Sequence, residues 1–160
     1  QENSRLEITW TVATAVVLLF VGVASYGVLA EEHVTDTGAA IESDGDTLRV
    51  QVVAERYAWT FNYPDHNVTS PGKLVLPVDR EVRMNVTSKD WIHSVHIPAM
   101  GIKQDAFPGQ ANFLTTEPTK TGGHQLYCAE YCGAGHSGML ATVEVMNQSD
   151  FQDWLDEQAN

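Results

Sequence analysis

Residues 128–139 bring together side chains that bind soft metal ions. The only two cysteines among the 160 residues, Cys128 and Cys132, lie four positions apart and are followed by His136 and Met139. Thiolate, imidazole and thioether groups select copper rather than magnesium, calcium or manganese. Three glycines in the same segment would let the backbone fold tightly enough to bring these groups together. The segment therefore predicts a copper-binding loop.

Other interpretations of two neighbouring cysteines account for less of this pattern. A disulfide would leave the histidine and the methionine unexplained. A structural zinc site takes four ligands, and methionine is a poor one. A mononuclear blue-copper site uses two histidines, one cysteine and a weak axial methionine, so it needs only one of the two cysteines. The second cysteine in the same loop predicts two copper ions that share two bridging thiolates.

A site with two copper ions needs one more nitrogen ligand from outside the loop. His93 and His96 lie upstream in a segment with the composition of a strand. Residues three apart in a strand point to opposite faces of the sheet. Only one of these histidines can therefore face the loop, and the spacing alone leaves both candidates open.

The chain from residue 47 onward consists of short runs of strand-forming residues separated by turn residues. Eight strands are predicted, at 48–54, 58–63, 73–77, 81–87, 92–97, 111–116, 124–128 and 140–146. Many short strands at this spacing are typical of a β-sandwich or barrel. About 100 residues make one domain of ordinary size, which we place at 47–148.

Two segments flank this domain. Residues 31–46 are polar and acidic, and this composition predicts an exposed linker. Residues 149–160 are predicted to form a short C-terminal helix with Ser149 or Asp150 as its N-cap. Three apolar residues of this helix would share one face. They are Phe151, Trp154 and Leu155.

Residues 8–30 contain no charged residue and are long enough to span a bilayer as a helix. A buried core helix would carry polar residues along one face. A signal peptide has a shorter apolar core and basic leading residues. Arg5 precedes the run, whereas no Lys or Arg follows it before Arg49. This bias predicts residues 1–7 as a cytoplasmic-side flank and the folded domain on the outer side.

Several motifs of the chain, in this order, resemble subunit II of cytochrome c oxidases. The loop reads C-x-E-x-C-G-x-G-H-x-x-M, and D-x-I-H-S at 90–94 and K-x-D-A-x-P-G at 103–109 precede it. The segment 3–11 is similar to the N-x-x-L-E-I-x-W-T that opens the second transmembrane helix of that family, without the proline that follows there. The resemblance implies an all-β cupredoxin-like Greek-key sandwich that holds a binuclear copper centre, CuA.

The resemblance also implies the ligands of this centre. They are the side chains of His93, Cys128, Cys132, His136 and Met139, and the backbone carbonyl of Glu130. The histidine after D-x-I is the ligand in the family, which selects His93 over His96. The Glu130 carboxylate would reach a magnesium or manganese ion at the boundary with subunit I, because hard cations prefer oxygen ligands. Nitrous oxide reductases have a tryptophan at that position of a similar loop.

The function implied by the resemblance is that of the electron-input subunit of a membrane haem–copper terminal oxidase. CuA would pass electrons through His136 to haem in subunit I, where oxygen is reduced to water and protons are transported. The catalytic oxygen site would lie in that other subunit, with no catalytic residue in this chain. Two alternatives are the CuA subunit of a nitric oxide reductase and a copper-binding chaperone.

The residue that accepts electrons is also implied by the resemblance. Residues 54–63 are similar to the aromatic strand G-H-Q-W-x-W-x-Y-x-Y of the family. Tyr57 takes the place of the first tryptophan, the usual point of electron input, and Trp59 matches the second. Both are candidate input residues, although an aromatic strand is more often only core packing.

The formal net charge of −12, with only four lysines, bears on the partners. No basic patch exists in the sequence, so nucleic acid is excluded as a partner. An acidic domain would steer a basic donor such as a cytochrome c. Acidic residues spread along the whole chain also fit adaptation to high salt, which screens such steering. We therefore expect the cell membrane of a prokaryote, with a halophile favoured, and either a cytochrome c or a small blue-copper protein as donor.

Overall fold

The computed structural model describes residues 3–29 and 46–159. These residues form an N-terminal helix and a separate β domain. The linker predicted at 31–46 lies outside the described residues except for Asp46. The domain boundaries that we placed at residues 30/31 and 46/47 stay predictions.

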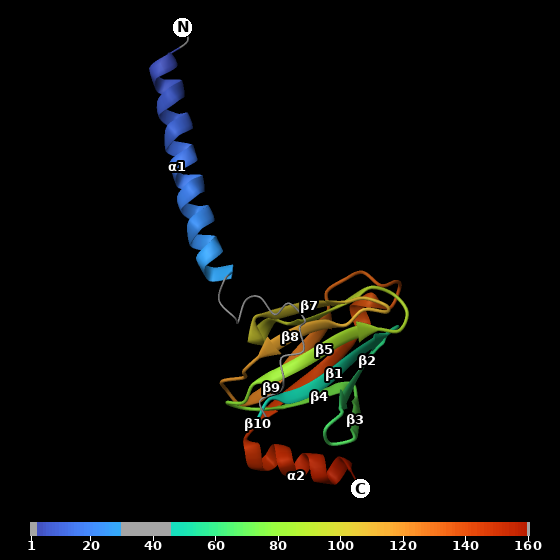
Figure 1. Ribbon diagram of the computed structural model, residues 1–160. Helices are drawn as coiled ribbons and strands as arrows, with labels where there is room; N and C mark the ends of the chain where they lie inside the picture. The colour runs from blue at the N-terminus through green and yellow to red at the C-terminus, as the bar shows by residue number, and fades with distance from the viewer. Residues whose placement is uncertain (1–2, 30–45, 160) are drawn as a thin grey trace. The chain divides into compact units, whose positions relative to one another are not determined.

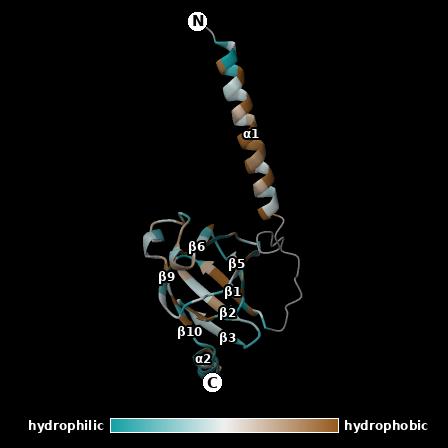
Figure 2. Ribbon diagram, turned by 90° about the vertical axis from the view of Figure 1, so that its left-hand side faces the viewer, coloured by the Kyte–Doolittle hydropathy of each residue, from teal (hydrophilic) through white to brown (hydrophobic). Residues whose placement is uncertain are grey.

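Helix α1 spans Ser4–Leu29, so it begins four residues before the predicted run 8–30. Its 26 residues extend over about 39 Å at 1.5 Å per residue, and the hydrocarbon core of a bilayer is about 30 Å thick. Three threonine hydroxyls within it donate to carbonyl oxygens four residues earlier, so these polar groups have partners on the helix itself. Apolar residues cover most of its surface (Figure 2). Among the described residues, α1 is the one helix long and apolar enough to cross a membrane.

The β domain consists of ten strands in two five-stranded sheets (Figure 1). The first sheet has the order β3-β2-β1-β5-β8. Its strands are β1 (Leu48–Glu55), β2 (Ala58–Tyr63), β3 (Val68–Pro71), β5 (Val82–Ser88) and β8 (Asn112–Thr116). The second sheet has the order β4-β10-β9-β6-β7. Its strands are β4 (Lys73–Pro77), β6 (His93–Ile97), β7 (Ile102–Ala106), β9 (Gly122–Cys128) and β10 (Leu140–Met146).

This arrangement confirms the predicted cupredoxin-like sandwich. All eight predicted strands are present, with ends that differ by a few residues. Two strands were missed, β3 and β7, and each lies at the edge of its sheet. Because β7 carries polar and half-buried residues, it lacks the apolar run that marks a buried strand. Strand β3 has only four residues and ends in a proline, so its sequence predicts a turn rather than a strand.

The core lies between the two sheets and is filled by alternate residues of the strands. In β5 every second residue is buried, which is the pattern of a strand with one face on the core. The hydroxyl of buried Tyr63 donates to the carbonyl oxygen of Val75 and accepts from its N–H, both at 2.8 Å. These two bonds join β2 of the first sheet to β4 of the second.

Helix α2 (Gln148–Gln158) follows β10 and packs on the core. Phe151 and Leu155 are buried and Trp154 is partly buried, as the predicted apolar face requires. The predicted N-cap was wrong. Asn147 caps the helix, because its side-chain oxygen accepts from the backbone N–H of Asp150.

Candidate metal centre

The copper-binding loop predicted from the sequence connects the neighbouring antiparallel strands β9 and β10. Cys128 is the last residue of β9, and its N–H donates to the carbonyl of Met139, at 3.1 Å, just before β10 begins. The loop is therefore closed at its base, with its first and last candidate ligands side by side. Gly133 has φ 123°, a backbone conformation that residues with a side chain rarely adopt.

Strand β6 brings His93 to this loop from the neighbouring strand pair. Val95 pairs with Cys128 in the antiparallel register of β6 and β9, so His93 lies two residues further along, across from the start of the loop. The N–H of Ala129 donates to the carbonyl of Ser94, at 2.9 Å, and continues this pairing into the loop.

Six donor groups meet between the loop and β6, and we call them the ligand cluster. They are the side chains of His93, Cys128, Cys132, His136 and Met139 and the backbone carbonyl of Glu130. The two sulfur atoms at its centre are 3.9 Å apart and belong to free cysteines. Each sulfur has one imidazole Nδ1 at 3.7 Å, from His93 beside Cys128 and from His136 beside Cys132.

The two remaining donors of the ligand cluster lie on either side of this sulfur pair. The Glu130 carbonyl oxygen is 3.2 Å from the Cys128 sulfur, and the Met139 sulfur is 3.8 Å from the Cys132 sulfur. The structure thus brings together every group that the resemblance implied as a ligand. The ligand atoms of His93, Cys128 and Cys132 all lie within 4.8 Å of one another, so these three residues could hold a metal ion.

Most of the ligand cluster is shielded from water. His93 and Met139 are fully buried, Cys132 is 1% exposed and Cys128 is 7% exposed, whereas His136 is only half-buried. Burial, followed by the effect of the neighbouring Cys128, raises the pKa of the Cys132 thiol to about 11. Two buried thiolates this close repel each other, so the site favours a bound cation that compensates their charge. The residues present therefore fit a soft metal ion.

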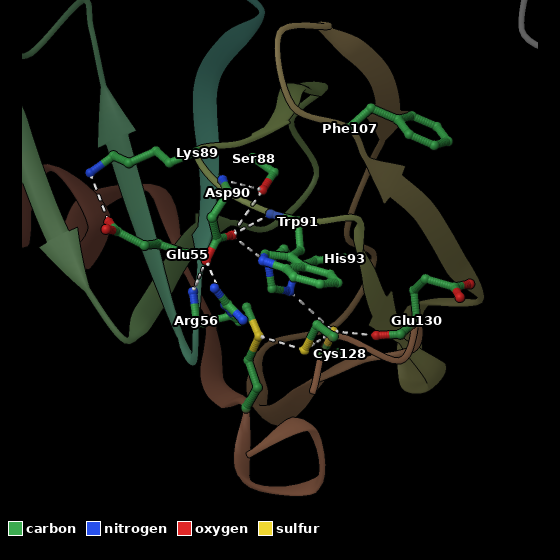
Figure 3. Close-up of polar contacts among 12 residues, drawn as sticks. Glu55, Arg56, Ser88, Lys89, Asp90, Trp91, His93, Phe107, Cys128 and Glu130 are labelled. Atoms are coloured by element: carbon green, nitrogen blue, oxygen red, sulfur yellow. Dashed lines mark hydrogen bonds and ion pairs between the residues drawn. The ribbon is translucent and has the colours of Figure 1, made fainter. Parts of the chain in front are cut away.

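Asp90 fixes the orientation of the His93 ring. Its Oδ1 lies 2.9 Å from His93 Nε2 and accepts from the N–H of Trp91 at 2.7 Å (Figure 3). Burial alone would raise the pKa of the Asp90 carboxyl, but hydrogen bonds from His93 and from the backbone N–H groups of Arg56 and Trp91 outweigh burial and hold this pKa well below its usual range. An ionised carboxylate only accepts, so Nε2 is the donor in this contact, and Nδ1 faces the Cys128 sulfur, where it could bind a metal ion.

His96 takes no part in the ligand cluster. It is half-buried on β6, and its Nδ1 has no hydrogen-bond partner among the described residues. Spacing along the sequence could not decide between His93 and His96. The structure places only His93 against the loop.

Three aromatic side chains surround the ligand cluster. Trp59 is buried beside it, with its Nε1 donating to the Met139 carbonyl at 3.4 Å and its ring edge-on to His93 at 6.2 Å. Tyr57 lies in the turn between β1 and β2, outside the aromatic strand to which the resemblance assigned it, and is 39% exposed. Exposed Tyr131 packs on the His136 ring, with 5.7 Å between ring centroids.

Sequence reasoning missed three residues that contact the ligands or their partners. Asp90 stands in the D-x-I-H-S motif, so its position three residues before His93 was the available signal. Tyr131 lies within the loop itself. Arg56 contacts Asp90 from 34 residues away, and no local pattern shows such a contact.

The fold and the ligand cluster define a cupredoxin-like metal-binding domain that follows an apolar helix. The family model described as "Cytochrome C oxidase subunit II, periplasmic domain" matches residues 66–146. The cytochrome c oxidase subunit 2 of Branchiostoma floridae is 31% identical over 172 residues, which cover 94% of this chain and 71% of that protein. The chain belongs to the cytochrome c oxidase subunit II family.

Other relatives agree with this assignment. The probable cytochrome c oxidase subunit 2 of Rickettsia bellii is 30% identical over 96% of this chain. The chain spans 62% of that protein and 53% of the Rickettsia felis one. The periplasmic domain of subunit II from Bradyrhizobium japonicum superposes with a TM-score of 0.67 at 28% identity, covering 69% of this chain and 92% of that chain. A chain of a heme-copper terminal oxidase dimer has the same fold, with a TM-score of 0.65 at 24% identity, over 89% of this chain and 99% of that one.

Proposed function

We propose that this chain is the electron-input subunit of a membrane haem–copper oxidase, with a binuclear CuA centre in the ligand cluster. One observation carries the proposal. Two buried cysteine sulfurs lie 3.9 Å apart, and each has its own imidazole nitrogen at 3.7 Å. This symmetric set suits two copper ions that share both thiolates, because each ion then also has one imidazole and one weak ligand. The weak ligands are the Met139 sulfur and the Glu130 carbonyl.

The chemistry that such a copper pair supplies is the storage and release of one electron. The protein contributes a fixed geometry. A backbone hydrogen bond between Cys128 and Met139 closes the base of the loop, and a second one, from Ala129 to Ser94, ties the loop to β6. Asp90 holds the His93 ring in the orientation that a ligand requires. Most of the ligands are buried and exclude water, and a rigid scaffold keeps the rearrangement between redox states small. These properties suit an electron relay rather than the site of oxygen reduction.

Electrons would reach the ligand cluster at Tyr57 and leave through His136. Tyr57 is partly exposed and its ring contacts the loop, whereas Trp59 is 1% exposed and can only act inside the domain. His136 is the more exposed of the two histidines in the ligand cluster. This exposure supports His136 as the point of contact with haem-bearing subunit I.

Glu130 would serve two sites at once. Its carbonyl oxygen points to the Cys128 sulfur, and its exposed carboxylate points away from the ligand cluster (Figure 3). The carboxylate is therefore free to bind a magnesium or manganese ion shared with subunit I, since hard cations take oxygen ligands.

Helix α1 would anchor the chain in the cell membrane of a prokaryote, with the β domain on the outer face. We propose a cytochrome c or a small blue-copper protein as donor and oxygen as the final acceptor, reduced in subunit I with coupled proton transport. The copper chaperone alternative fits the described residues less well. A chaperone needs exposed, exchangeable sulfur ligands, and here Met84 and Met139 are fully buried.

Copper loading of the full chain in detergent tests the proposal. We expect two copper ions per chain and an EPR spectrum in which one unpaired electron couples to two copper nuclei. Cys132→Ser is the matched variant, and it should bind a single copper with the spectrum of one nucleus. One copper per wild-type chain would reject the binuclear site. Purification with a haem-bearing subunit, followed by oxygen and nitric oxide turnover, then separates an oxidase from a nitric oxide reductase.

A further inference from the structure

Arg56 lies in the turn between β1 and β2 and makes two hydrogen bonds to one oxygen of Asp90. Its backbone N–H donates to Asp90 Oδ2 at 2.9 Å, and its Nε donates to the same oxygen at 3.2 Å. The other oxygen, Oδ1, accepts from His93 Nε2. One oxygen of the Asp90 carboxylate therefore binds the Arg56 cation, and the other binds the candidate copper ligand His93 (Figure 3).

Trp91 holds the guanidinium in this place. The Arg56 Cζ atom lies 4.7 Å from the centre of the Trp91 ring, within the range of a cation–π contact. A planar guanidinium can stack on an aromatic face and donate sideways at the same time, which an ammonium group cannot do. The Arg56 side chain is 39% exposed, yet these two contacts fix the position of its charge.

The charge of Arg56 has a defined effect on His93. A carboxylate that accepts from the Nε2 proton makes an imidazole a stronger donor to a metal, which favours the oxidised, more positive state. A cation bound to the same carboxylate withdraws electron density from that hydrogen bond. Its own field also disfavours the more positive state of a nearby metal. Both effects raise the reduction potential.

We propose that Arg56 is a positioning residue that acts through Asp90 on His93 and raises the reduction potential of the metal centre. The proposal rests on the proposed function, because it requires copper bound by His93. It assigns to this chain a tuning element built from two side chains that do not bind the metal, the guanidinium of Arg56 and the ring of Trp91.

Lys89 offers a matched control. It is the residue next to Asp90, but its Nζ pairs with Glu55 Oε2 at 3.0 Å, and both side chains of this pair are more than half exposed. Lys89→Gln removes one positive charge from the same part of the surface without breaking a contact to Asp90. Arg56→Gln removes the same charge together with the side-chain contacts to Asp90 and Trp91, whereas the backbone N–H of residue 56 still donates to Asp90.

The experiment is a redox titration of the copper-loaded full chain in detergent, followed by its absorption spectrum. We expect Arg56→Gln to lower the midpoint potential by more than Lys89→Gln does. In an Asp90→Asn background, the shift caused by Arg56→Gln should be smaller than in the wild-type background, because only the direct field of the guanidinium then remains. Equal shifts for the two single variants, or an Arg56→Gln shift that persists undiminished in the Asp90→Asn background, would overturn the proposal.

Two further measurements keep the outcomes separate. If Asp90→Asn fails to hold copper, the comparison of Arg56→Gln with Lys89→Gln still decides, because neither variant changes a ligand. Copper content and the EPR spectrum of the wild-type chain are measured first. A single bound copper would reject the binuclear site, and the Arg56 comparison then stays valid if His93→Ala abolishes binding of that ion.

Discussion

The ring of Tyr57 lies so close to Gly135 that a Cβ atom at residue 135 would be 2.4 Å from the ring carbon Cδ2. A Cβ at Gly133 would likewise be 2.7 Å from the Tyr57 hydroxyl oxygen. The Tyr57 ring, which comes from the turn between β1 and β2, therefore packs directly against two glycines of the copper-binding loop. The loop and the candidate input residue form one packed unit.

Gly135→Ala should disturb this unit. The added methyl group must push the ring or the loop aside, and such overpacking costs about 1–3 kcal/mol. We expect a lower melting temperature and weaker copper binding, measured by thermal unfolding and by competition with a copper chelator. Gly138→Ala is the control in the same loop, because a Cβ there meets nothing within 4 Å. Equal effects of the two substitutions would show that the Tyr57 contact does not matter.

His93→Ala should remove one nitrogen ligand and abolish the EPR spectrum of two coupled copper nuclei. His96→Ala should keep that spectrum, because the His96 side chain lies outside the ligand cluster. The two histidines stand on one strand, so the pair of variants controls for damage to β6. The reverse result would mean that the register of β6 against the loop is wrong.

Glu130→Gln should keep the copper spectrum, because the group near Cys128 is the backbone carbonyl. Loss of the carboxylate charge should weaken binding of the magnesium or manganese ion that we propose at the boundary with subunit I. We expect slower electron transfer onward to haem, with reduction of copper by the donor unchanged. Stopped-flow kinetics of the whole complex, together with its magnesium and manganese content, measures this. Unchanged content and rate in the variant would limit Glu130 to its backbone role.

Tyr63 makes the stability of the β domain depend on pH in the alkaline range. Burial raises the pKa of its hydroxyl well above the ordinary value of 10.0, although the hydrogen bond with Val75 opposes this. The folded state thus keeps the neutral hydroxyl where the unfolded state ionises. The stabilisation is complete below about pH 10 and is lost above it, by about 1.4 kcal/mol per pH unit.

Tyr63→Phe removes this ionisation and leaves the N–H and carbonyl of Val75 without their partner. The variant should be less stable than the wild type by about 1–3 kcal/mol at neutral pH. That difference should shrink as the pH rises above about 10. Urea unfolding at several pH values measures it, with Tyr131→Phe as the control because Tyr131 is 75% exposed. A difference that stays constant up to pH 11 would contradict the raised pKa.

The sequence predicted those parts of the molecule that depend on local patterns. Short runs of strand-forming residues between turn residues located the central strands, and the spacing of Cys128 and Cys132 located the loop. Edge strands such as β7 were not predicted, because they bury few side chains on either face. The contact between Arg56 and Asp90 was not predicted, because the two residues are 34 positions apart and only the pairing of distant strands brings them together. Even the choice between His93 and His96 needed either the family resemblance or the register of β6.

The hydrogen bonds of Tyr63 to Val75 also affect how the domain meets other proteins. Strand β4 is at the edge of its sheet, where unpaired backbone groups can recruit a strand from another chain and start aggregation. At Val75 both backbone groups are already bound by the Tyr63 hydroxyl. A foreign strand would have to break two buried hydrogen bonds before it could pair there. The same hydroxyl that joins the two sheets therefore protects this edge against unwanted strand addition.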